Sequence, residues 1–491
     1  MKRIVILLLV LALVTGGVIF TRTGLHRIYL PTATGITAKQ VCSLHFVSGF
    51  TPQRARALYV DPLLGDAARL VSATVGENEV RSNLLGFLYG QRAVFREGIG
   101  CTLVHDGRDF DETLSLPWDR PFEAMTLDAA HRDAVFDTHA LEAAIDQAFA
   151  EPEGGGRNTL AVVVLHEGRL VAERYGDGVT PATPLHGWSM TKSLAATLAG
   201  AMVHRGEITL QAQAITDEEV LEETPQKGEI TLEHLLRMTA GLRLDERNDG
   251  TDPNSQMLFT QSDMAAWAAR QPLVHEPGTH WQYMSGQTVL ATRAMQDALP
   301  GPMIEDLAAV RARVFAPLAM HSAIFETDEA GTLQGSSYMY AAAQDWARMG
   351  QAYLDDGLAP DGTRVFGPGF DEIVATHTVG GTREGAAGDR DYGLGFWLGH
   401  PSVEALSGTV YMGGFQGQRA FIVPDADLVV VRLGATNFAD DGTFALLANV
   451  FAALRPQMDP VEAVEGFETP GPADLPVEDE DTVGEPEGLP Q

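Results

Sequence analysis

Lysine is scarce in this chain of 491 residues, which has four, at Lys2, Lys39, Lys192 and Lys227. Lys and Arg together number 34 against 66 Asp and Glu, so the formal net charge is -32. A surface this negative repels phosphate backbones at long range, and we therefore expect no nucleic-acid partner. Hydrophobic residues make up 45% of the chain, which is enough for a substantial core and for more than one folded unit.

Cysteine is almost absent, since Cys42 and Cys101 are the two in the chain. Both follow an apolar run over residues 4–20, which would be about 25 Å long as a helix and is typical of a signal peptide or a signal anchor. No Ala-x-Ala-like cleavage site follows, which favours an uncleaved anchor within residues 1–30. An even cysteine count after an export signal predicts one Cys42–Cys101 disulfide, in a protein anchored in a bacterial inner membrane with its catalytic domain in the periplasm. Two free thiols in a cytosolic protein are the alternative.

The remainder of the chain divides into three parts. Residues 31–116 mix short apolar segments with glycine and polar breaks, and we interpret them as an accessory region without a catalytic pattern. Residues 117–455 form the predicted catalytic domain. Residues 456–491 are acidic and proline-rich and contain no Lys or Arg, which predicts a disordered, solvated extension.

Strand patterns lie at both ends of the predicted catalytic domain. After a predicted helix over residues 139–150, a hairpin with strands at 159–165 and 170–175 turns at His166-Glu167-Gly168. Near the other end, the pattern predicts strands over 408–412, 419–423 and 428–433 and a helix over 444–454. Mostly helical and loop sequence lies between these ends. We therefore expect an α/β fold whose antiparallel sheet is formed from both ends of the domain, flanked by helices, with an inserted and mainly helical subdomain.

Ser189 and Lys192 open a predicted helix that continues over residues 194–203. Residues three apart on a helix face the same way, so the lysine amine can take the proton of the serine hydroxyl and activate it as a nucleophile. A position at the helix N-terminus also directs backbone N–H groups at a developing oxyanion. A neutral Lys192 needs a pKa about three units below its ordinary value, which burial can supply, so we expect no acid paired with this amine. A surface lysine on a helix is the alternative for this motif alone.

A second motif, at residues 275–286, carries Tyr283 and Ser285 after a Pro-Gly turn. Their hydroxyls are able to relay a proton between the lysine, the serine and a leaving group, whereas the alternative is a buried structural tyrosine. Pro277 and Gly278 prevent the helix that an H-E-x-x-H metal site needs, so we expect no metal here.

A third motif is the glycine pair Gly413-Gly414, followed by Phe415. Glycine on an edge strand allows a substrate backbone to approach closely, and a neighbouring N–H would complete an oxyanion hole. A simple turn is the alternative.

The stretch 244–254, which includes Glu246, is strongly acidic. It is either a solvated loop or a site for calcium or for an amine on the substrate.

In this order and at these separations, Ser189-x-x-Lys192, Tyr283-x-Ser285 and the Gly413-Gly414 strand resemble the serine β-lactamase and penicillin-binding-protein superfamily. The most similar branch includes class C β-lactamases, related esterases and 6-aminohexanoate-dimer hydrolases. Residues 230–242 and 391–397 are similar to the helix after the nucleophile helix and to the late core segment of that branch, and the resemblance covers roughly residues 137–455.

The resemblance implies a role for each motif. Ser189 would be the acylated nucleophile, Lys192 its base, and Tyr283 the acid and base for the leaving group and the deacylating water. The N–H groups of Ser189 and Phe415 would form the oxyanion hole, without a metal or an organic cofactor. Substrate contacts would come from five residues, namely Trp188, Glu246, Ser285, Gly413 and Gly414.

Two departures from the family pattern narrow the expected substrate. Ser285 stands where β-lactamases usually have Asn, and the third motif begins with Met412 rather than with Lys or His. Without that cation a substrate carboxylate is held less well, so we expect a serine hydrolase that acts on a small amide or ester through an acyl-serine intermediate. The alternatives are a catalytically silent protein of the same fold that binds cell-wall fragments or a partner, and a peptidoglycan DD-peptidase or β-lactamase.

Overall fold

The computed structural model describes residues 26–105, 110–243, 245–299, 301–378, 380, 382–383, 390–437 and 439–455. Across these ranges, no helix combines the length and the apolar character that crossing a membrane requires. The apolar run at 4–20 and the acidic tail at 456–491 lie outside the described residues. The N-terminal anchor and the disordered tail therefore stay predictions.

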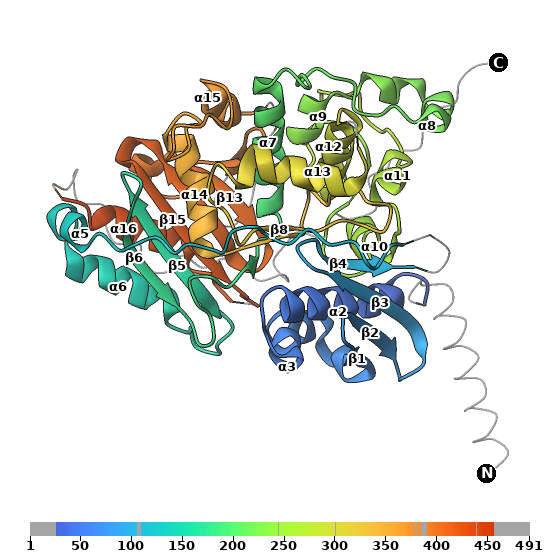
Figure 1. Cartoon of the computed structure of the whole chain (residues 1–491), viewed down its shortest axis with the longest axis horizontal. Helices are drawn as coiled ribbons and strands as arrows, with labels where there is room; N and C mark the ends of the chain where they lie inside the picture. The colour runs from blue at the N-terminus through green and yellow to red at the C-terminus, as the bar shows by residue number, and fades with distance from the viewer. Residues whose placement is uncertain are drawn as a thin grey trace, which may run out of the picture.

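The predicted accessory region is a helix packed against a small sheet. Helix α2 (Tyr29–Phe46) lies against a four-stranded antiparallel sheet in the order β1-β2-β3-β4, with short helices α3 (Pro52–Ala55) and α4 (Asp61–Leu64) beside it. The strands are β1 (Val71–Val75), β2 (Glu79–Leu84), β3 (Leu88–Arg96) and β4 (Gly100–Val104). This unit is blue in Figure 1 and lies beside the larger domain. The structure confirms the predicted disulfide, which joins Cys42 on α2 to Cys101 on β4 with their Cα atoms 6.1 Å apart.

A buried ion pair connects this N-terminal unit to the catalytic domain. The ammonium of Lys39 on α2 pairs with Glu326, and both side chains are buried. The other Glu326 oxygen accepts hydrogen bonds from Ser43 Oγ (2.8 Å) and from the backbone N–H of Cys101 (2.6 Å). Because each of these groups would be costly to bury alone, the contact fixes how the two units pack.

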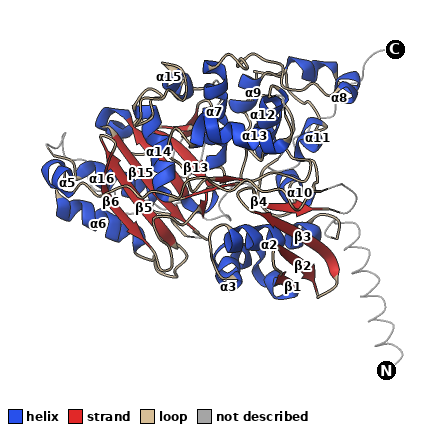
Figure 2. Cartoon of the chain, viewed as in Figure 1, coloured by secondary structure: helices blue, strands red, loops and turns tan. Residues whose placement is uncertain are grey.

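The larger sheet combines both ends of the catalytic domain. Its described strands follow the order β10-β11-β12-β13-β14-β15-β5-β6. Strand β15 pairs antiparallel with β5, so Val431 lies opposite Val163, as the two-ended sheet prediction requires. The strands are β5 (Thr159–His166), β6 (Arg169–Tyr175), β10 (Thr382–Arg383), β11 (Arg390–Tyr392), β12 (Trp397–Leu398), β13 (Val410–Gly414), β14 (Gln418–Val423) and β15 (Leu428–Gly434), shown in red in Figure 2.

Helices cover both faces of this sheet. Helices α6 (Thr138–Phe149) and α16 (Thr443–Ala452), close to their predicted ranges, pack on one face, and α7 (Met190–His204) and α14 (Ala343–Leu354) on the other. Alternate residues of β5 therefore enter different cores, with Val162 on the α6 side and Val163 on the α7 side. Burial on both faces explains why β5 is a continuous apolar run rather than an alternating one.

The segment between β6 and β10 is mostly helical, as predicted. It also contains a small antiparallel sheet in the order β7-β9-β8, which lies beside the start of α7. Its other elements are α8 (Glu218–Glu223), α9 (Leu232–Leu236), α10 (Pro253–Thr260), α11 (Met264–Ala269), α12 (Ser285–Asp297), α13 (Met303–Val310) and α15 (Phe370–Ala375), with strands β7 (Leu185–His186), β8 (Ile324–Phe325) and β9 (Met339–Ala341). Helix α5 (Ala129–Val135) precedes α6 and lies beside β6.

Candidate active site

Ser189 lies at a sharp turn from a strand into a helix. Strand β7 ends at His186, and Trp188 then adopts a left-handed backbone conformation with φ of 47° before Ser189 takes the N-cap position of α7. A Cβ atom on Gly187 would stand 2.3 Å from the ring of buried Trp346, so the turn passes where only glycine fits. This strained turn presents the serine at the helix N-terminus, where backbone N–H groups point outward.

Lys192 is buried next to that serine, with a relative exposure of 1%. Its amine lies 3.0 Å from Ser189 Oγ, 3.0 Å from Ser285 Oγ and 3.1 Å from the carbonyl oxygen of Ser336. These three oxygen atoms hold the amine in one position and direct it at the serine hydroxyl. The structure thus brings together Ser189, Lys192 and Ser285, as the sequence motifs predicted.

The pKa of Lys192 is low for a lysine. Burial lowers this pKa to about 8, and the carboxylate of Glu246 opposes the effect by raising it. A substantial share of the amine is therefore uncharged just above neutral pH, when it can accept a proton. Among the described residues Lys192 forms no ion pair, but the charge of Glu246 acts on it through space.

Glu246 has a contact that the sequence did not predict. Its carboxylate accepts a 2.7 Å hydrogen bond from the backbone N–H of Ser285, the first residue of α12. A carboxylate at a helix N-terminus satisfies a free N–H donor and interacts favourably with the helix dipole. Glu246 therefore positions the start of α12, and with it the Ser285 hydroxyl that contacts Lys192. Its predicted substrate contact stays a prediction.

Tyr283 faces the same amine. The Lys192 Nζ atom lies 4.9 Å from the centre of the Tyr283 ring. The ring itself is half-buried and packs against Trp397, with centroids 5.2 Å apart, and against Tyr392, with centroids 5.8 Å apart. The aromatic neighbours restrict its orientation, so the third predicted catalytic residue also lies at this centre.

Strand β13 closes the other side of the centre. A Cβ atom on Gly414 would stand 2.2 Å from the carbonyl oxygen of Gly187, and one on Gly413 would stand 2.9 Å from the Trp397 ring. The two glycines therefore allow the strand to approach the turn that carries Ser189. Phe415, which follows them, is 40% exposed and packs edge-on against Trp188 with ring centroids 5.6 Å apart.

Three groups at this centre were absent from the predicted site. The carbonyl of Ser336 holds the amine, Gln416 Oε1 accepts a 3.1 Å hydrogen bond from Trp188 Nε1, and Tyr392 packs on Tyr283. Tyr392 lies inside the segment 391–397 and Gln416 directly follows Phe415 of the third motif, so their neighbourhood could have been inferred. The Ser336 carbonyl is a backbone group far from Lys192 in the sequence, so no sequence pattern points to it.

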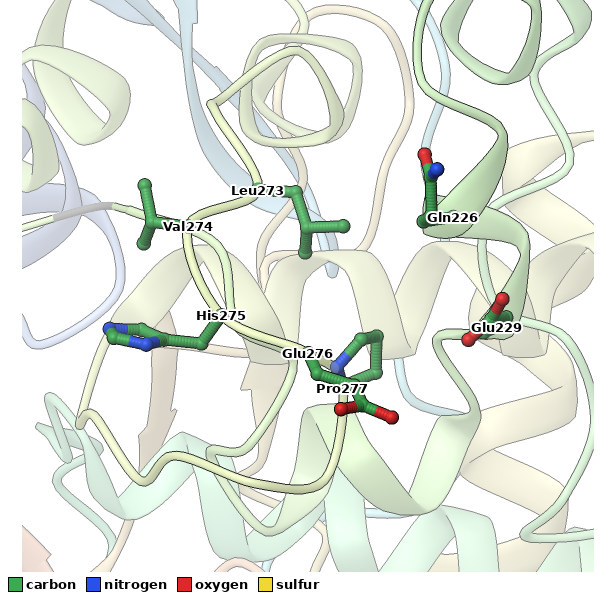
Figure 3. Close-up of a pocket in the computed structure, with 7 residues that line it drawn as sticks. All are labelled: Gln226, Glu229, Leu273, Val274, His275, Glu276 and Pro277. Carbon is green, nitrogen blue, oxygen red and sulfur yellow. The ribbon is translucent and has the colours of Figure 1, made fainter. Parts of the chain in front are cut away.

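A cavity of about 430 Å³ lies beside the loop at residues 273–277 (Figure 3). It is lined by Gln226, Glu229 and residues 273–277, and the lining contains none of the predicted catalytic residues. Next to it the His275 and His280 rings stack with centroids 3.9 Å apart across the Pro-Gly turn. The cavity thus borders the loop that leads to Tyr283 rather than the reacting groups.

Within the described ranges, the group of His and acidic side chains close enough to share a metal ion lies elsewhere, at His131, His166 and Glu167. The centre around Ser189 instead combines a hydroxyl, a partly neutral amine, a phenol and a helix N-terminus. Such a set performs nucleophilic acyl transfer.

Residues 142–454 match the family model described as Beta-lactamase. The chain is 28% identical to the 6-aminohexanoate-dimer hydrolase of Paenarthrobacter ureafaciens over 300 residues, which cover 56% of this chain and 72% of that protein. It is 27% identical to penicillin-binding protein 4 of Amycolatopsis lactamdurans over 376 residues, covering 68% of this chain and 93% of the relative.

A solved structure from Bacillus anthracis, assigned provisionally as a 6-aminohexanoate-dimer hydrolase, is similar in fold. The match has a TM-score of 0.52 at 22% sequence identity and covers 67% of this chain and 85% of the other. The similarity shows a shared fold.

Proposed function

Because this chain belongs to the beta-lactamase family, we propose that it is a serine hydrolase that cleaves a small amide or ester through an acyl enzyme on Ser189. The observation that carries the proposal is the buried amine of Lys192, 3.0 Å from Ser189 Oγ and with a pKa of about 8. A binding protein of the same fold would have no need to keep a lysine buried at this position.

In the acylation step, the Ser189 oxygen forms a bond to the substrate carbonyl carbon while its proton moves to the neutral Lys192 amine. Two electrons of the carbonyl bond move to its oxygen, which becomes an oxyanion. The N–H groups of Ser189 and Phe415 stabilise this oxyanion, and the position of Ser189 at the N-cap of α7 supports the assignment. The close approach of Gly414 to Gly187 supports the N–H of the next residue, Phe415, as the second donor.

Tyr283 then protonates the leaving group as the carbonyl re-forms and the bond to the amine or alcohol breaks. In deacylation, water gives a proton to the deprotonated Tyr283 and attacks the acyl carbon. The bond from this carbon to the Ser189 oxygen then breaks, and Lys192 returns the proton to Ser189. The Lys192 amine lies 4.9 Å from the ring centre, a proximity that supports a shared proton pathway.

Met412 makes a small amide or ester the favoured substrate. It is completely buried on β13, so this position offers no cation to a substrate carboxylate. The similarity to a 6-aminohexanoate-dimer hydrolase supports an amide in particular, because a dimer of an amino acid contains an amide bond. The similarity to a penicillin-binding protein makes peptidoglycan peptides the second candidate.

We also propose that the catalytic domain faces an oxidising compartment, the bacterial periplasm, and that residues 1–30 anchor it in the inner membrane. The buried Cys42–Cys101 bond and the preceding apolar run support this location. Fractionation of a bacterium that expresses the full chain would place the protein with inner membranes. Protease added to spheroplasts would digest the domain, whereas resistance to protease there would contradict the location.

The direct test of the catalytic proposal is labelling with a fluorophosphonate probe. The wild-type full chain should gain one adduct, located by mass spectrometry on the peptide that contains Ser189. Ser189→Ala should gain none, while the matched control Ser407→Ala, which alters an exposed serine, should label as the wild type does. Labelling that survives in Ser189→Ala would overturn the nucleophile assignment.

Substrate panels separate the remaining alternatives. A burst of leaving group from aryl esters or anilides, followed by slower turnover, is expected of an acyl enzyme. Release of D-alanine from muropeptides, with no turnover of the other panels, would instead identify a DD-peptidase. Labelled penicillin is a second probe for a reactive serine. If neither fluorophosphonate nor labelled penicillin forms an adduct, the chain is a catalytically silent binding protein.

A further inference from the structure

Two histidines and a glutamate meet at the far end of the large sheet. His166 is the last residue of β5, Glu167 begins the turn into β6, and His131 lies on α5. The backbone N–H of Asp128, which caps α5, donates to the carbonyl of Leu170 on β6 at 2.8 Å. This contact holds the start of α5 against the hairpin and brings His131 over His166.

The donor atoms of these side chains converge. His131 Nε2 lies 2.9 Å from His166 Nδ1 and 3.8 Å from a carboxylate oxygen of Glu167, and the three atoms lie within 4.8 Å of one another. Ligand atoms on a tetrahedral zinc ion, with bonds of about 2.0–2.1 Å, are about 3.3 Å apart. We propose that His131, His166 and Glu167 bind a divalent transition-metal ion, Zn²⁺ or a neighbour in the first row. This inference is independent of the proposed hydrolase function.

The burial of the three side chains suits a bound cation that is reached from the solvent side. His166 is 8% exposed, and the side chain of His131 is 11% exposed, whereas the Glu167 side chain is 53% exposed and open to solvent. Two imidazole rings with their nitrogen atoms close together, and the Glu167 carboxylate on the solvent side, offer the lone pairs and the negative charge that a bound metal ion requires.

The donor set also indicates the class of metal. Two imidazole nitrogens and one carboxylate oxygen suit zinc and its first-row neighbours, whereas calcium and magnesium prefer oxygen ligands alone. Three protein ligands leave further coordination positions for water. Glu167 has φ of 51° in a two-residue turn with Gly168, a position where asparagine, aspartate or glycine is usual.

The site lies far from the catalytic centre. Along β15 and β5, the pair Gly434–Thr159 is at the end of the sheet near the turn after Gly414, and the pair Leu428–His166 is at the other end. Seven residues of strand separate them, which is about 23 Å. A metal ion here would join α5 to the β5–β6 hairpin and thereby stabilise the start of the catalytic domain, without taking part in acyl transfer.

The test is a zinc titration of the purified full chain, stripped with a chelator and then titrated with ZnCl₂ against a competing fluorescent chelator. The wild type should bind one equivalent, and zinc should raise its thermal unfolding temperature. His131→Ala and His166→Ala should each weaken binding at least about 100-fold, and the exposed Glu167→Gln about 10-fold. His275→Ala is the matched control, because it removes a histidine from a pair outside the proposed site, His275 and His280, and should leave the affinity unchanged.

The wild-type titration decides the proposal even where a buried variant fails to fold. The proposal would be overturned if the wild type bound no zinc. It would also be overturned if His131→Ala and Glu167→Gln both bound zinc as tightly as the wild type, or if His275→Ala abolished binding. Fluorophosphonate labelling of Ser189 should be the same with and without zinc, so failure of the metal site and failure of the hydrolase proposal give different results.

Discussion

Replacement of Lys192 by methionine tests whether burial lowers the pKa of this amine, so that the neutral form can accept a proton. Methionine has a similar length and no charge. One pKa unit corresponds to about 1.4 kcal/mol, so the fall of the Lys192 pKa from 10.5 to about 8 corresponds to about 3 kcal/mol of unfavourable protonation in the folded state. Below pH 8 the wild-type protein bears this full cost, because the lysine is protonated both folded and unfolded.

Between about pH 8 and 10.5 the unfolded chain binds the lysine proton and the folded chain does not. The free energy of unfolding of the wild type, measured relative to Lys192→Met, should therefore rise with pH through this window by about 3 kcal/mol in total. The three hydrogen bonds that the variant loses contribute a constant offset and leave the slope unchanged. Other titrating groups cancel because they are common to both proteins.

Urea unfolding of both proteins at closely spaced pH values measures this difference. In parallel, kcat/KM of the wild type should rise with pH and level off above about pH 8, since the free amine is the active form. Lys192→Met should show no burst at any pH. A stability difference that is flat or falls between pH 8 and 10.5 would refute the argument that burial depresses this pKa.

Four further perturbations test other parts of the structure. Tyr283→Phe should lower kcat by about 10²–10⁴ in the burst assay, and a smaller loss would remove the phenol from the proton pathway. Glu246→Gln should move the rise in kcat/KM to lower pH, because its carboxylate raises the pKa of Lys192; an unmoved profile would contradict that interaction. Gly414→Ala places a Cβ atom 2.2 Å from a carbonyl oxygen, so it should slow fluorophosphonate labelling, and a normal rate would show that β13 has room there. Reduction of the bond between Cys42 and Cys101, separated by 59 residues, should lower the urea unfolding free energy by about 4 kcal/mol, whereas unchanged stability would show that the bond is dispensable.

Local patterns were sufficient for a large part of the fold. The hairpin of β5 and β6, the strands β13 to β15 and the helices α6, α7 and α16 all lie close to their predicted ranges. Each combines a clear hydrophobic period with turn residues at its ends, and such elements depend little on distant contacts. The spacing of Ser189 and Lys192 was equally informative, because helix geometry alone brings residues three apart together.

The unpredicted features depend on packing between distant segments. Nothing near Lys39 in the sequence indicates that it pairs with Glu326, and nothing near Glu246 indicates that it caps the first residue of α12. Likewise, His131 and His166 meet only because α5 docks on the hairpin. A single sequence offers no signal for such partners, since they are chosen by the three-dimensional fold rather than by spacing.

The pairing of β5 with β15 has a consequence for biosynthesis. A ribosome makes the strand at residues 159–166 long before its partner at 428–434, so β5 leaves the exit tunnel with one long edge uncovered. Until β15 has been made, the unpaired backbone groups of that apolar strand can pair with other nascent chains. The serine centre can therefore assemble only after β13, which packs against the turn at Gly187, has been made.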